Sequence, residues 1–97
     1  MPNTFEIIDK LGRKIRLTTE QWSHIRKKHP EVEDCELIKE TIKKPDKITD
    51  YDLDETVFYY YKYYKYRSSH EKYLQVIVKY INGEGFILTA QFKPYIR

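Results

Sequence analysis

Apolar and polar residues alternate over several short stretches, which is the spacing of β-strands whose successive side chains point to opposite faces. We expect strands at 4–9, 13–17, 57–66, 72–81 and 86–92, with a further short one at 48–51. Gly12 lies between the first two strands and supplies the positive φ of a hairpin turn. Asn82 and Gly83 turn the chain between the last two.

Two other stretches follow helical spacing. Thr18 and Gln21 match a capping box, which predicts a helix over 18–28. The stripe of this helix that packs comprises Trp22, Ile25 and His29. His24 and Lys28 lie on a different stripe, and Pro30 ends the helix.

A second helix is expected over 34–43. Its apolar residues recur at helical spacing, with acidic residues in the first turn and lysines in the last, as the helix dipole favours. These apolar residues are Cys35, Ile38 and Ile42. Pro45 follows and ends the helix.

The stretch 57–66 reads VFYYYKYYKY and carries tyrosines and lysines on both faces of the expected strand. In one interpretation the tyrosine rings pack on a core while their hydroxyls stay in water. In the other, the rings stack on bases and the lysines neutralise phosphates. This strand taken alone favours the first interpretation.

The last two strands each have one apolar face. These faces comprise Leu74, Val76, Val78 and Tyr80 on one strand, and Phe86, Leu88, Ala90 and Phe92 on the other. Matching the two apolar faces across the hairpin brings four polar residues together on the opposite surface. These residues are Gln75, Lys79, Thr89 and Gln91. That surface is too polar to be core.

The elements predict an α+β domain: an N-terminal β-hairpin and two helices packed on one face of a three- or four-stranded antiparallel sheet. A single domain, 1–97, is expected for this length. Cys35 is the only cysteine, which fits a reducing cytoplasm. Since no apolar run approaches the ~20 residues of a membrane span, we expect no membrane association.

Charge is segregated along the chain. Between Glu31 and Glu55 there are ten acidic residues and four lysines, whereas the rest carries 14 basic and five acidic residues. A basic surface on a small domain indicates a polyanion partner. Ordinary solvated faces explain the segregation equally well, because separation in sequence does not ensure separation in space.

We expect neither a metal nor a cofactor. The acidic run at 50–55 lacks the glycine and the twelfth-position glutamate of a calcium loop, since Glu55 and Tyr61 occupy those places. His24 and His29 are five residues apart, not the four of a zinc-binding HExxH motif.

RNA cleavage suits the remaining side chains, because RNA supplies its own 2′-hydroxyl nucleophile and needs only proton transfer and charge stabilisation. Histidine fits either proton role. His24 is the candidate because it lies off the stripe that packs. We interpret His29 as structural and His70 as a solvated loop residue.

Several segments, in this order, resemble a known group of nucleases. They are IRLTTEQWSHIRKKHPE at 15–31, then IKKPDKI, YYYK, VIVKYI and GFILTAQF. The chain resembles the small barnase/EndoU/colicin/RelE-like nucleases, closest to the phage-associated branch called PBECR. The histidine–glutamate pair of barnase and the paired histidines of EndoU are not recognisable in it.

The resemblance implies helices packed on an antiparallel sheet whose open face holds the active site of a metal-independent endoribonuclease. Catalytic roles are expected for His24, Lys79, Thr89 and Tyr61, and substrate contacts for Arg16, Lys62, Lys28 and Gln91. Because many family members are toxins neutralised by a partner or delivered by phage, it also implies an RNA substrate and an acidic antitoxin or immunity protein. Two alternatives stay open, a non-catalytic RNA-binding module and a protein-interaction domain, and the protein is expected to be a monomer or homodimer.

Overall fold

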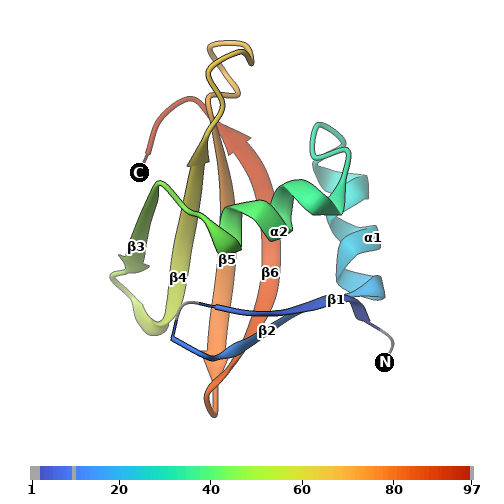
Figure 1. Cartoon of the computed structure of the whole chain (residues 1–97). Helices are drawn as coiled ribbons and strands as arrows, with labels where there is room; N and C mark the ends of the chain where they lie inside the picture. Colours follow the sequence, from blue (N-terminus) through green and yellow to red (C-terminus); the bar gives the residue numbers. More distant parts are fainter. Residues whose placement is uncertain (1–2, 10, 97) are drawn as a thin grey trace.

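A computed structural model of the chain describes residues 3–9 and 11–96, and shows an α+β fold of two helices on a six-stranded sheet (Figure 1). In chain order the elements are β1 (Asn3–Ile8), β2 (Lys14–Thr18), α1 (Thr19–Lys28), α2 (Cys35–Lys43), β3 (Lys47–Tyr51), β4 (Asp54–Tyr63), β5 (Tyr73–Ile81) and β6 (Glu84–Lys93). Lys10, in the expected first turn, lies outside the described residues. Neither described helix is long and apolar enough to span a lipid bilayer.

The sheet has more strands than the three or four expected. Its order is β1-β2-β6-β5-β4-β3, so the N-terminal hairpin joins the same sheet. The junction is a short parallel pairing, Ile15 with Gly85 and Arg16 with Phe86, within an otherwise antiparallel sheet. The expected hairpin of β1 and β2 is confirmed. The alternation of residues in β2 carried no information about its second neighbour, β6, because that pairing is decided by distant residues.

Gly85 makes this junction feasible. A Cβ atom on Gly85 would lie 2.8 Å from Ile15 Cγ1 and 2.9 Å from Tyr80 Cε1, which is closer than packed atoms tolerate. The missing side chain therefore lets β2 approach β6.

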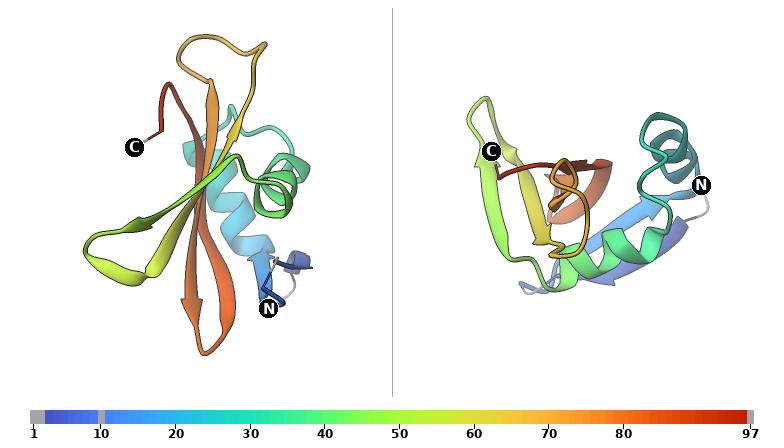
Figure 2. Two further views of the ribbon diagram at one scale, coloured as in Figure 1. Left: turned by 60° about the vertical axis from the view of Figure 1, so that its left-hand side comes forward. Right: turned by 90° about the horizontal axis from the view of Figure 1, so that it is seen from above.

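The first helix begins at the cap that the sequence predicts, and the second begins at a cap, Asp34, that was not predicted. The hydroxyl of Thr18 accepts a hydrogen bond from the backbone N–H of Gln21, and Asp34 accepts one from the N–H of Glu36. The helices and the β1–β2 hairpin lie against one face of β4–β6, with α1 beside β6 (Figure 2). The main core fills this covered face. Its fully buried members include Ile15, Leu17, Ile25, Val32, Ile38, Leu74, Val76, Val78 and Ala90.

The expected faces of the last strand are correct only for its second half. A bulge between Ile77 and Val78 in the β5–β6 register shifts the pairing so that Lys79 opposes Phe86 and Val78 opposes Ile87. As a result Ile87 is buried in the core, Leu88 is exposed, and Phe86 joins the opposite face with Lys79. Perfect alternation across 86–92 was therefore wrong, since one extra residue reverses the faces before it.

The tyrosine-rich strand lies three residues earlier than expected, at 54–63, and its hydroxyls are not all in water. Tyr61 is completely buried, and Tyr60 is nearly so. The Tyr60 hydroxyl lies 2.5 Å from that of Tyr80, and the Tyr61 hydroxyl accepts a hydrogen bond from Gln75. Polar partners within the protein therefore replace water for both side chains.

Candidate functional site

The face of the sheet opposite α2, called here the open face, carries a row of hydrogen-bonded polar side chains. Tyr61, Gln75 and Gln91 oppose one another on β4, β5 and β6. Gln75 Nε2 donates to the Tyr61 hydroxyl at 2.8 Å, and Gln91 Nε2 donates to Gln75 Oε1 at 3.0 Å. Gln75 is only 2% exposed, so this row is ordered by its own bonds. Tyr61 is buried beneath the surface, where it orients Gln75.

A second row places an aromatic ring between two cations. Lys79 opposes Phe86, which in turn opposes Arg16 on β2. The guanidinium carbon of Arg16 lies 5.2 Å from the centroid of the Phe86 ring. Thr89 is nearby on the same face, opposite Ile77, two residues before Lys79 along β5. The structure thus brings Lys79, Thr89, Gln91 and Arg16 onto one surface.

Both cations are ion-paired. Lys79 Nζ donates to Asp54 Oδ2 at 3.1 Å. Arg16 contacts the carboxylate of Glu84 closely, and its Nε lies 3.8 Å from Glu6 Oε2. Hydrogen bonds from Thr56, and after them the bond from Lys79, lower the pKa of Asp54 to about 2. The Asp54 carboxylate, which faces Lys79, is therefore ionised at neutral pH.

Helix α1 lies against the edge of β6, along the part of this strand that follows the residues paired with β2. The side-chain amide of Gln21 donates to the carbonyl of Leu88, the residue before Thr89. Gln21, His24 and Lys28 recur at spacings of three and four, so they form one stripe of the helix. Ile25 is buried on another side. His24 and Lys28 are exposed on a stripe that starts at the β6 edge.

Among the described residues, the His24 imidazole has no hydrogen-bond partner. Nothing within those residues selects which ring nitrogen carries the proton. Its neighbour at the helix end, His29, has its backbone N–H bonded to Ile25 and its ring Nδ1 3.8 Å from Glu31. This position agrees with a structural role at the helix terminus.

Lys62 does not lie on the open face with the other predicted site residues. It has the parity of Tyr60 and so lies on the helix-covered side, where its Nζ is 3.4 Å from the carbonyl of Lys44. Tyr61 and Lys62 are adjacent in β4, and adjacent strand residues face opposite ways. Two predicted site residues, Tyr61 and Lys62, therefore lie on opposite faces of the sheet.

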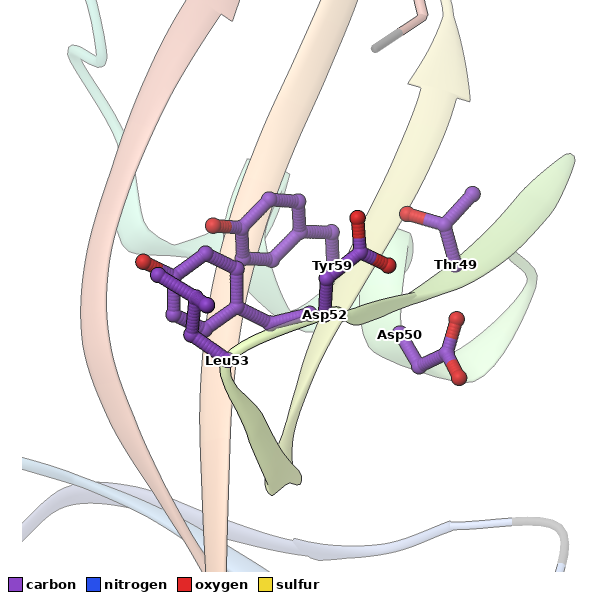
Figure 3. A pocket seen from close by; sticks show the side chains of 6 residues that line it. Thr49, Asp50, Asp52, Leu53 and Tyr59 are labelled. Atoms are coloured by element: carbon purple, nitrogen blue, oxygen red, sulfur yellow. The ribbon is translucent and has the colours of Figure 1, made fainter.

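A cavity of about 440 Å³ opens at the other end of the sheet, at the β3–β4 turn (Figure 3). Tyr51 and Tyr59 stack along it with ring centroids 5.9 Å apart, and Asp52 and Leu53 complete its rim. None of the predicted site residues lines it. Within the described residues, no cluster of three or more His, Cys, Asp or Glu side chains is arranged to hold a metal ion.

The open face also includes Phe86, Asp54 and Glu84, which the sequence pattern did not indicate. Phe86 was assigned to the core because the bulge was not foreseen. The two acidic residues looked like turn residues, and their contacts with Lys79 and Arg16 span 25 and 68 positions. The only available signal was the NG turn at 82–83, which brings Glu84 to the start of β6.

Comparison with known proteins identifies no relative: no protein-family description, curated protein or solved structure matches this chain. Assignment to the nuclease family therefore remains a prediction.

Proposed function

We propose that the protein is a metal-independent endoribonuclease of the toxin-like or phage-associated kind, which cleaves by attack of the 2′-hydroxyl and leaves a 2′,3′-cyclic phosphate. One observation carries the proposal: Lys79 and Arg16 lie on either side of Phe86 on an open face that also bears Thr89 and Gln91. Cations around an aromatic ring suit a nucleic-acid strand, whose phosphates need charge and whose bases need a stacking surface.

Each part of the reaction has a side chain to perform it. Lys79 and Arg16 offset the charge that grows on the phosphate, and Thr89 and Gln91 donate hydrogen bonds to its oxygens. His24 takes the proton from the attacking 2′-hydroxyl and then gives it to the leaving 5′-oxygen, because an imidazole can act as either base or acid at neutral pH. The hydrogen bond from the Gln21 side chain to the Leu88 carbonyl joins α1 to β6, and His24 lies on the same stripe of α1 as Gln21. This contact supports the approach of His24 to the sheet.

The test is incubation of purified protein with several RNAs in EDTA. Wild type should yield fragments ending in cyclic phosphate, whereas His24→Ala and Lys79→Ala should lower the rate by about 10²-fold or more. Lys62→Ala and His70→Ala are matched controls, since they remove the same residue types from the covered face and from an exposed loop. Intact RNA with wild type, or equal cleavage by His24→Ala, contradicts the proposal.

A second candidate, RNA binding without cleavage, is favoured by the unpartnered imidazole of His24, because a general base is normally oriented by another group. In that case RNA binds without product formation, and His24→Ala leaves the affinity unchanged.

An acidic antitoxin is proposed only as a partner for the same two cations, Lys79 and Arg16. It would compete with RNA for them.

A further inference from the structure

Lys79 and Arg16 are both held by carboxylates of this chain. We propose that Asp54 and Glu84 are built-in competitors of RNA phosphates, which occupy the two cations in the free protein and are displaced when RNA binds. This inference rests on the proposed function of the open face and adds a control on its affinity.

Asp54 is held in place by hydrogen bonds that do not involve Lys79. Its Oδ1 accepts hydrogen bonds from the backbone N–H of Thr56 at 2.9 Å and from the Thr56 hydroxyl at 2.6 Å. Only Oδ2 serves Lys79. Release of Lys79 therefore leaves an ordered, hydrogen-bonded carboxylate that does not have to move.

The Lys79–Asp54 pair is also weak enough to exchange. The two side chains are 37% and 33% exposed, and ion pairs in contact with water contribute little because water and salt screen them. A strand that presents several phosphates at once can displace such a pair, whereas a single small anion competes poorly with a tethered carboxylate. The arrangement thus favours a polyanion over free phosphate.

The carboxylates near Arg16 do not satisfy all of its hydrogen-bond donors. It contacts Glu84 and Glu6, yet its Nε is buried and has no hydrogen-bond partner among the described residues. A buried donor without a partner is rare in proteins. Guanidinium groups bind phosphate through two parallel hydrogen bonds, which would include this Nε once the side chain turns toward RNA.

The test measures equilibrium binding of a single-stranded RNA whose 2′-hydroxyls are methylated, so that no cleavage intervenes. Asp54→Asn should tighten binding by about fivefold at low salt, since it frees Lys79. The slope of log affinity against log salt should steepen by about 0.7, because the freed lysine now releases a counterion on binding. Asn retains an oxygen to accept the Thr56 N–H, so the turn is preserved.

Two controls separate this effect from a change in net charge. Asp52→Asn removes the same charge from the same β3–β4 turn, where Asp52 is exposed and pairs with no cation in the described part of the chain, so affinity and slope should change little. In a Lys79→Ala background, Asp54→Asn should give no further gain. Glu84→Gln should have a smaller effect than Asp54→Asn, because Glu6 still faces Arg16.

Three outcomes overturn the inference. Equal gains from Asp54→Asn and Asp52→Asn would show that only net charge matters. A gain that persists without Lys79 would show that the pair is not the source. Wild type that binds RNA while Asp54→Asn binds no better would refute the competition but leave the proposed function intact, whereas absence of binding by every variant would refute both.

Discussion

The two faces of the sheet treat polar groups in opposite ways. On the covered face, Asp9 is buried at the rim of the core and accepts hydrogen bonds from the backbone N–H of Leu11, from Arg13 and from the Tyr80 hydroxyl. On the open face, Lys79 and Asp54 remain about one-third exposed. Internal partners satisfy Asp9 on the first face. On the second face the buried pair Tyr61 and Gln75 is also satisfied internally, but water or a ligand can replace the partner of Lys79.

Aromatic side chains show the same contrast. Burial, together with the neighbouring Tyr60 hydroxyl, raises the pKa of Tyr80 far above its usual range, so its hydroxyl stays protonated and donates to Asp9. The Arg13 guanidinium lies 3.8 Å from the Tyr80 ring centroid. Arg16 lies near Phe86 in a similar way, but at 5.2 Å and on a surface open to solvent. The first stacking covers the buried ring of Tyr80 and stabilises the fold, whereas in the second Arg16 is also held by the carboxylates of Glu84 and Glu6.

Two isoleucines on opposite faces give the largest expected difference. Ile87 is 3% exposed in the main core, whereas Ile77 is partly buried and packs against a small cluster on the open face. That cluster comprises Val57, Tyr59 and Tyr61. Ile87→Ala should lower the free energy of unfolding by about 2–4 kcal/mol, and Ile77→Ala by roughly half of that or less. Urea unfolding of both variants tests this. Equal losses would mean that the small cluster on the open face stabilises the fold as much per side chain as the main core does.

Asp9 gives the next largest effect and a dependence on pH. Burial alone would raise the pKa of Asp9, but hydrogen bonds from Arg13 and Leu11 outweigh burial and leave the pKa lowered. Its contribution is therefore full above the unfolded pKa of about 3.9 and is lost as pH falls from there through the folded pKa. Asp9→Asn should cost about 1–3 kcal/mol at neutral pH.

The measurement is the free energy of unfolding of wild type and Asp9→Asn as pH is lowered from neutrality. The gap between the two should close below the unfolded pKa. Asp52→Asn serves as the control, because its carboxylate is exposed and should leave the acid limb unchanged. If the difference in free energy of unfolding between wild type and Asp9→Asn does not change with pH, the substitution destabilises the protein through packing and not through the lost charge.

The smallest effect concerns the polar row of the open face. Tyr61→Phe removes the acceptor for Gln75 Nε2 while keeping the ring, so it should cost about 1–2 kcal/mol for a buried donor left without a partner. If the row also orients Gln91 toward RNA, Tyr61→Phe should lower the affinity for methylated RNA, whereas the control Lys62→Ala should not. Unchanged stability would indicate that Gln75 finds another acceptor.

Local features were predictable from local residues. Thr18 caps α1 as expected, since the cap and its partner Gln21 are three residues apart. The NG pair at 82–83 adopts positive φ at both residues and turns β5 into β6. Joint placement of Gln75 and Gln91 on the open face also followed from the alternation in two neighbouring strands.

Other features depended on contacts between distant residues. The bulge that moves Phe86 and the burial of Tyr61 both follow from how β4, β5 and β6 pack. The partners of Lys79 and Arg16 were likewise hidden, because charge counted along the chain does not tell which carboxylate folds against which cation.

The amino-acid pattern by itself determined the α+β class, both helices with the cap of the first, and the alternation that makes one surface of β5 and β6 polar, because these depend on residues only a few positions apart. Only the tertiary structure decided that the first hairpin extends the sheet beside β6 and that both cations of the open face are occupied by carboxylates. Those outcomes arise from packing and electrostatics between segments far apart in the chain, which no local spacing encodes.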